Sequence, residues 1–177
     1  MNKEGLIQAT LVYPLRDNKV WLARKQKKVA AGLYSGWGGK KEPHHQSITD
    51  TAVEELDEEN DYGIQYRRED LIPRAVIDFT LNYSEKPSFA MKVFIYVLNG
   101  FEGELGDSDE IKDPQSFSLD EVPYDQMLPD NILFLPQVLD LEVEPFIGEI
   151  VSQDGKIVQK HLETISKDEI YRIFEEN

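Results

Sequence analysis

The sequence predicts an α+β sandwich in which helices cover a mixed, partly antiparallel sheet. Several segments rich in β-branched and aromatic residues alternate with turn signals, which is typical of strands. Two internal segments instead carry apolar residues at helical spacing behind a capping residue or a proline. Because 177 residues with 40% hydrophobic content are enough for one core, we expect a single domain over residues 1–177.

The strands are expected in three hairpin-like pairs. Residues 6–15 and 20–25 flank a polar turn near the start of the chain. Residues 71–81 and 89–98 form the second pair. The third pair, 146–151 and 156–163, surrounds Asp154-Gly155, and Asp-Gly is a strong hairpin signal. The remaining acidic stretch, 100–114, reads as a loop, and 118–121 reads as a short turn or helix start.

The main helix is expected between Ser47 and Asn60. Ser47 and Asp50 have the spacing of a capping box, with Asp in place of the usual Glu. A second helix is predicted over residues 131–141, with Pro136 as a kink site. A last helix over residues 166–177 is predicted to fray, as chain ends commonly do.

A glycine-rich segment, GWGGK at residues 36–40, precedes the main helix. The helix then carries Glu55, Glu58 and Glu59 at positions i, i+3 and i+4, which project from one side of a helix. A tight glycine turn can approach a phosphate chain closely. Converging carboxylates suit Mg²⁺ or Mn²⁺, which often bridge a protein to substrate phosphates. The segment therefore predicts metal-assisted chemistry on a diphosphate.

Composition narrows the partners. A net charge of −15 argues against binding to long nucleic acid, although one local pocket can still accept a nucleotide. The absence of cysteine excludes disulfides, thiolate zinc sites and cysteine nucleophiles, and it fits a cytoplasmic protein. The start of the chain has no signal-peptide core, and no apolar run is long enough to span a membrane. The sequence gives no view of the oligomeric state.

Gly38-Gly39-Lys40, followed by Glu55-Leu56-x-Glu58-Glu59, resembles the Nudix hydrolase box. The family pattern is G-x5-E-x7-R-E-U-x-E-E-x-G-U, where U is a bulky aliphatic residue. Several matches in one order are more specific than the box alone. Four further segments resemble, in the same order, the subfamily of oxidised-purine nucleoside triphosphatases of the 8-oxo-dGTP diphosphatase type: residues 33–40, 107–110, 119–124 and 127–131. The resemblance implies the Nudix α/β/α sandwich.

The resemblance also implies an activity and a site. The protein would be a Mg²⁺-dependent pyrophosphohydrolase, with Mn²⁺ as a substitute, that cleaves a nucleoside triphosphate (oxidised purines included) to monophosphate and pyrophosphate. Its metal ligands would be Glu55, Glu58, Glu59 and a backbone oxygen near Gly39. Glu110 would be a further ligand or the base that takes the proton of the attacking water. Contacts with the small-molecule nucleotide are implied for Lys25, Ser35, Lys40, Leu128, Asp130 and Asn131. Asp130 can equally be the N-cap of the helix that follows.

The box is altered at several positions. Glu54 stands where the pattern has Arg. The upstream Glu of the pattern falls on Gln46, or on His45 if the count starts from Gly39. The glycine pair comes one residue early, which implies a one-residue insertion within residues 43–45. Asp61 stands where the pattern has the glycine that closes the helix, and Asp can also adopt that conformation.

These alterations leave alternatives open. The chain can be a catalytically impaired Nudix domain that binds a nucleotide or a protein partner. It can also hydrolyse another nucleoside diphosphate derivative. Four residues are candidates for replacing the missing cation: Lys40, Lys41, Arg67 and Arg68. The adjacent His44 and His45 are expected to be exposed loop residues rather than ligands.

Overall fold

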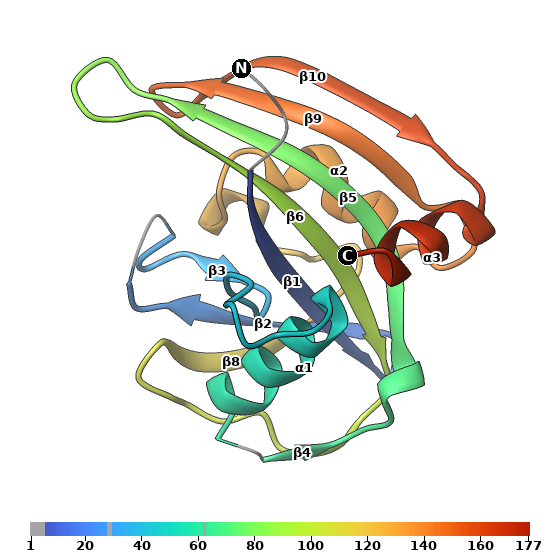
Figure 1. Cartoon of the computed structure of the whole chain (residues 1–177). Helices are drawn as coiled ribbons and strands as arrows, with labels where there is room; N and C mark the ends of the chain where they lie inside the picture. Colours follow the sequence, from blue (N-terminus) through green and yellow to red (C-terminus); the bar gives the residue numbers. More distant parts are fainter. Residues whose placement is uncertain (1–5, 28–29, 62) are drawn as a thin grey trace.

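The computed structural model describes residues 6–27, 30–61 and 63–177. Its centre is an eight-stranded sheet in the order β10-β9-β5-β6-β1-β2-β3, with β8 paired to β2 (Figure 1). The strands of this sheet are β1 (Ile7–Arg16), β2 (Lys19–Lys25), β3 (Tyr34–Ser35), β5 (Leu71–Asn82), β6 (Phe89–Asn99), β8 (Ile111–Ser118), β9 (Phe146–Gln153) and β10 (Lys156–Thr164). A small second sheet pairs β4 (Ile64–Gln65) with β7 (Glu102–Gly103).

Three α-helices accompany the sheet. They are α1 (Ile48–Glu59), α2 (Asn131–Leu139) and α3 (Lys167–Glu175), with short 3-10 helices at Arg68–Asp70 and Tyr124–Gln126. None of the described helices is long and apolar enough to cross a membrane. The predicted mixed sheet is confirmed, because β1 runs parallel to β6 and β5 parallel to β9, while the other pairs are antiparallel.

The helices pack on opposite faces of the sheet. Helices α1 and α3 share one buried cluster through residues such as Leu56 and Phe174, together with Phe94 and Tyr96 of β6. Helix α2 contributes Phe134 and its neighbours to a separate cluster on the other face. Figure 1 shows this layering, with α1 and α3 in front of the sheet and α2 behind it. The predicted α/β/α sandwich is therefore confirmed.

The glycine-rich segment is held along β1. Strands β1 and β2 pair with each other beside the turn that joins them, where Leu15 is opposite Val20 and Arg16 is opposite Lys19. Farther along β1, residues 36–41 take the place beside it. Four backbone hydrogen bonds fix them: Thr10 N–H to Gly39 O at 2.8 Å, Val12 N–H to Trp37 O at 2.6 Å, Trp37 N–H to Val12 O at 2.9 Å and Lys41 N–H to Gln8 O at 2.9 Å. The segment is thus part of the sheet rather than a free loop.

Helix α1 is bounded as its sequence predicts. Ser47 and Asp50 form a reciprocal capping box, which satisfies two backbone N–H groups at the start of the helix. After the helix, Asp61 has φ of 55°, the left-handed conformation that closes a helix and that the family pattern assigns to glycine. The capping box and Asp61 fix where the helix begins and ends, and hence the direction of its glutamates.

A buried arginine supports the far end of α2. Arg74, which is 2% exposed, lies at a bulge of β5 between Pro73 and Ala75. Its guanidinium donates to the carbonyl groups of Val138 (3.0 Å), Gln137 (2.9 Å), Asp140 (2.8 Å) and Val143 (3.0 Å). Helices end with carbonyl groups that lack partners, so this one side chain satisfies the end of α2.

Two sequence predictions were wrong. The acidic segment 100–114 was expected to be a loop, yet it contains β7 and the first half of β8. Strand β8 escapes prediction because it is polar and interrupted by Pro114 and by Asp113 with φ of 55°, features of an exposed edge strand. The last helix was expected to fray, but Ile170 and Phe174 are buried and Gln8 Nε2 donates to Oδ1 of Asn177 at 2.8 Å.

Candidate functional site

The carboxylate of Glu55 lies directly against the glycine turn. A Cβ atom added to Gly39 would be 2.3 Å from Oε2 of Glu55, a distance at which something must move. Gly38 is equally confined, because its φ is 150° and an added Cβ would lie 2.2 Å from the carbonyl oxygen of Thr10. Glycine is required at both positions, since any side chain would displace either the carboxylate or β1.

Glu59 is held from two sides. Its side chain is 4% exposed, and Oε1 accepts from Nζ of Lys25 at 2.7 Å, while Oε2 accepts the backbone N–H of Gly38 at 2.9 Å. Burial raises the pKa of Glu59, and the cation of Lys25 and the Gly38 hydrogen bond oppose that rise. The helix, the glycine turn and the end of β2 therefore meet at this carboxylate.

Glu110 joins the same site from the loop before β8. Its charge also raises the pKa of Glu59, so the two carboxylates are close enough to repel. The pairing of β2 with β8 explains the approach, because Lys25 stands opposite Ile111, the residue after Glu110. In addition, the carbonyl oxygen of Glu110 accepts the N–H of Gln26 at 2.9 Å.

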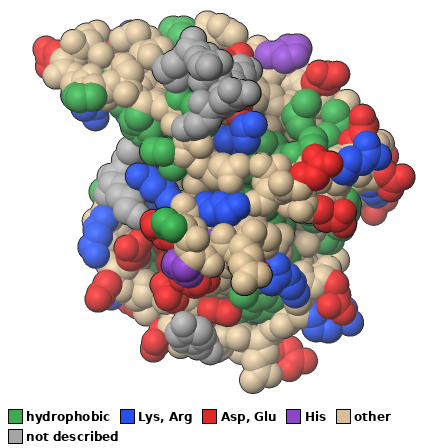
Figure 2. All heavy atoms as spheres, in the orientation of Figure 1, with side chains coloured by type: hydrophobic (Ala, Val, Ile, Leu, Met, Phe, Trp, Pro, Cys, Tyr) green, Lys and Arg blue, Asp and Glu red, His purple; other side chains and the backbone are tan. Residues whose placement is uncertain are grey.

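Glu58 and Lys40 are the sequence neighbours of Glu59 and Gly39. Both side chains are exposed, in contrast to the buried Glu59 and the half-buried Glu55. Figure 2 shows the face that carries α1, where basic side chains gather near the middle and acidic side chains with a histidine border them. In a chain of net charge −15, such a local group of cations can favour an anionic ligand.

The residues expected to read the base form a second group. Asn131 is buried at the start of α2, where its amide nitrogen donates to Oδ1 of Asp130 at 3.1 Å and its amide oxygen accepts from Tyr13 Oη at 3.3 Å. Burial raises the pKa of Asp130. Asp130 occupies the N-cap position of α2, as the capping alternative expects, but its side chain makes no cap hydrogen bond to the helix. Leu128 and Ser35 are half-buried. Ser35, on β3, is paired with Ala23 of β2.

The two groups are separated by the sheet. Glu55 and Glu59 belong to α1, whereas Asp130 and Asn131 lie at the start of α2, on the opposite face. The structure thus unites Glu55, Glu59, Glu110 and Lys25, whereas Asp130 and Asn131 lie at the start of the helix on the other face.

The three carboxylates of this site are suited to bind a divalent cation. Glu55, Glu59 and Glu110 supply only oxygen donors, which Mg²⁺ and Mn²⁺ prefer. The repulsion between Glu59 and Glu110 is the kind of strain that a bound cation relieves. The carbonyl oxygen of Gly38 lies 3.5 Å from Nζ of Lys25, which places a backbone oxygen beside the same carboxylates.

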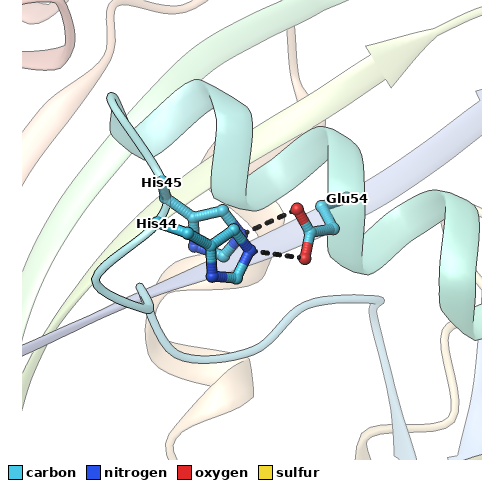
Figure 3. Close-up of side chains that lie close together, drawn as sticks. All are labelled: His44, His45 and Glu54. Atoms are coloured by element: carbon cyan, nitrogen blue, oxygen red, sulfur yellow. Dashed lines mark hydrogen bonds and ion pairs between the residues drawn. The ribbon is translucent and has the colours of Figure 1, made fainter.

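Sequence reasoning missed the partners of Glu54. Nε2 of His44 lies 2.8 Å from Oε1 of Glu54, and Nε2 of His45 lies 3.2 Å from Oε2 (Figure 3). His45 is buried, so the expectation that both histidines are exposed was wrong for this residue. Three of the four proposed substitute cations have other partners: Arg68 pairs with Asp50 at 2.8 Å, Arg67 pairs with Asp70 at 2.9 Å and Lys41 donates to the backbone of Asn177.

A sequence signal for this contact existed. The inferred insertion falls within residues 43–45, which include the two adjacent histidines of the chain. The helix position where the family pattern has arginine holds the acid Glu54. A cation lost from the helix and a basic pair gained in the loop are complementary changes. The three side chains are also close enough to hold a metal ion, since their ligand atoms lie within 4.8 Å of one another.

No family model matches the chain. It is 32% identical over 152 residues to the oxidized purine nucleoside triphosphate hydrolase of Danio rerio, covering 86% of this chain and 90% of that protein. It is 30% identical over 145 residues to the protein of the same name from Mus musculus, covering 82% and 86%.

Two solved structures share the fold. The mutator MutT protein from Bacillus halodurans matches with a TM-score of 0.72 and 22% identity, over 89% of this chain and 98% of that one. A NUDIX hydrolase from Nitrosomonas europaea matches with a TM-score of 0.61 and 16% identity, over 85% and 81%. Sequence and structure agree, and the chain belongs to the Nudix hydrolase family, beside the oxidized purine nucleoside triphosphate hydrolases.

Proposed function

We propose that this protein is a Mg²⁺-dependent pyrophosphohydrolase that cleaves a nucleoside triphosphate to a monophosphate and pyrophosphate, with Mn²⁺ able to replace Mg²⁺. The observation that carries the proposal is the meeting of Glu59, Lys25 and the Gly38 N–H, with Glu55 against Gly39 beside them. The names of the Danio rerio and Mus musculus relatives support an oxidised purine as the substrate.

Each residue has a proposed task. Glu55, Glu58, Glu59 and a backbone oxygen of the Gly38–Gly39 turn hold the cation, which when bound neutralises phosphate charge and makes water a better nucleophile. Glu110 accepts a proton at its carboxylate, since it lies near Glu59 yet outside the helix that carries the other acids. Lys25 and Lys40 contact phosphate oxygens, one from the buried side of the site and one from its exposed rim.

The base would be read by the second group. Asp130 and Asn131 present a carboxylate beside an amide, and Ser35 and Leu128 complete the proposed contacts. Because Asn131 already donates to Asp130 and accepts from Tyr13, both ends of its amide have partners before a base arrives. A carboxylate beside an amide offers both acceptors and donors, which favours a broad range of purines. A single domain over residues 1–177 and a cytoplasmic location complete the proposal.

The test is a substrate panel in Mg²⁺ and in Mn²⁺. It should contain oxidised and normal purine triphosphates, ADP-ribose and nucleotide sugars, with Glu59→Gln as the inactive comparison and Glu163→Gln, on the exposed strand β10, as the matched control. Release of monophosphate and pyrophosphate, lost by about 100-fold or more in Glu59→Gln, is the expected result. Hydrolysis of ADP-ribose or a nucleotide sugar alone would change the substrate class. Thermal stabilisation by nucleotides without any turnover would instead favour a binding module.

A further inference from the structure

We propose that His44, His45 and Glu54 form a clamp of reversed charge that positions the glycine turn and Glu55 for cation binding. The family pattern places an acid in the loop and a cation on the helix, at the positions of Gln46 and Glu54. Here the helix contributes the acid and the loop contributes the two imidazoles. The inference concerns the cation site of the proposed function and rests on it only for the effect on turnover.

The clamp closes the loop against α1 from the end opposite to the glycine turn. Gly39 meets Glu55 at one end of the loop, and His44 and His45 meet Glu54 at the other end. Glu54 and Glu55 are consecutive residues of α1. The loop therefore touches two neighbouring side chains of the helix, so a shift at Glu54 is transmitted to the carboxylate that lies against Gly39.

The ring of His45 is set for this role. The backbone N–H of Glu42 donates to Nδ1 of His45 at 2.9 Å. Because a neutral imidazole has one N–H and one acceptor nitrogen, the proton of His45 is on Nε2, which faces Oε2 of Glu54 at 3.2 Å. The two atoms are therefore in close contact, although the geometry does not meet the requirements of a hydrogen bond.

The same hydrogen bond argues against a metal ion at this cluster. A metal bound at Nε2 needs the lone pair of that nitrogen, and histidine ligands usually donate from their other ring nitrogen. Nδ1 of His45 instead accepts, so the ring would have to lose its bond from Glu42 before it could ligate. The hydrogen bond from Nε2 of His44 lowers the pKa of Glu54, and slight desolvation opposes this effect.

The first test reads the protonation of His45 by long-range ¹H–¹⁵N NMR of the full chain. The expected spectrum shows His45 with its proton on Nε2 and a bare Nδ1. A proton on Nδ1 would overturn the proposal. So would Zn²⁺ binding that shifts the His44 and His45 resonances together and disappears in Glu54→Ala, because the cluster would then be a metal site.

The second test measures Mn²⁺ affinity by electron paramagnetic resonance, without any nucleotide. Variants His44→Ala/His45→Ala and Glu54→Ala should weaken Mn²⁺ binding by about tenfold, as supporting residues of metal ligands do. His45→Gln should keep an affinity within about threefold of the wild type, since an amide can accept from Glu42 and donate to Glu54. The side chain of Glu54 is 39% exposed, so Glu54→Ala keeps the test open even if the double variant fails to fold.

The sign of the histidine effect separates the clamp from simple charge. If Glu54 acted only through its charge, removing the histidines would not weaken Mn²⁺ binding. Tighter or unchanged binding in His44→Ala/His45→Ala would overturn the clamp. If the wild type turns over no nucleotide while Mn²⁺ follows the expected pattern, the proposed function fails and the clamp stands. Where turnover is present, kcat should fall with the affinity while KM changes less than about threefold.

Discussion

Lys25 and Glu59 form an ion pair of 2.7 Å whose carboxylate is almost completely buried and also accepts the N–H of Gly38. The pair joins the end of β2 to the end of α1. Removing one partner of a buried pair leaves an uncompensated charge, which costs more than the pair itself contributes. Removing Lys25 should therefore leave the buried carboxylate of Glu59 without its cation, whereas Glu59→Gln removes the proposed metal ligand itself.

The Lys25→Met variant should shift the acid side of the pH–activity profile to higher pH. Burial already raises the pKa of Glu59, and Lys25 is the main group that opposes this, so its loss raises the pKa further. More of the variant is then protonated at a given low pH, and a proton competes with the cation. We expect kcat/KM to fall about 10- to 100-fold at pH 7, and further at pH 6. An unchanged acid limb, with Lys160→Met as the control on exposed β10, would contradict this account.

The Gly39→Ala variant should fold normally and lose cation binding. The added methyl would lie 2.3 Å from a carboxylate oxygen of Glu55, and the flexible end of that side chain can move away. Stability should therefore change little, while Mn²⁺ affinity falls about tenfold or more. Gly106→Ala is the matched control, because the nearest atom to its added Cβ, the carbonyl oxygen of Asn60, is 4.0 Å away. Equal Mn²⁺ affinities in the two variants would refute the contact.

The Arg74→Met variant should lower the free energy of unfolding by about 2–4 kcal/mol, because it leaves buried carbonyl groups at the end of α2 without donors. Urea denaturation measures this value. Arg67→Gln should change it by less than about 0.5 kcal/mol, since the side chain of Arg67 is 72% exposed. A loss in Arg74→Met no larger than that of the control would show that water or other donors replace the guanidinium.

The Asp154→Asn variant should remove a stabilising effect that depends on pH. Hydrogen bonds from Ser84 and then Gln153 lower the pKa of Asp154 from 3.8 to about 2. The folded-state pKa is below the unfolded value, so this stabilisation is full above pH 3.8 and is lost as pH falls toward 2. Asparagine tolerates the φ of 49° at this turn, so the hairpin itself is kept.

The difference in Tm between wild type and Asp154→Asn should therefore be largest near neutral pH and shrink below pH 3.8. Ser84→Ala should reproduce part of this change from the other side of the contact, since Ser84 donates to Asp154 with both its N–H and its hydroxyl. A Tm difference that is the same at pH 2 and pH 7 would show that the carboxylate charge is irrelevant.

Sequence patterns predicted the elements that bury apolar side chains. The pairs β5–β6 and β9–β10 and helix α1 follow their predicted bounds within about three residues, because periodicity and turn chemistry act locally. Strand β8 was missed since its position depends on pairing with β2 rather than on its own composition. The pairing of Lys25 with Glu59 and of both histidines with Glu54 joins residues 9 to 34 positions apart, and only the packed fold brings them together.

The ladder along β1 also determines where this part of the chain can change in length. Backbone hydrogen bonds to β1 fix the register as far as Lys41, and the capping box fixes the helix from Ser47 onward. An extra residue can be accommodated only in the short stretch between these two anchors, which is where the two histidines lie. A longer loop that carries these histidines therefore reaches Glu54 of α1 while the glycine turn and the metal-binding glutamates keep their places.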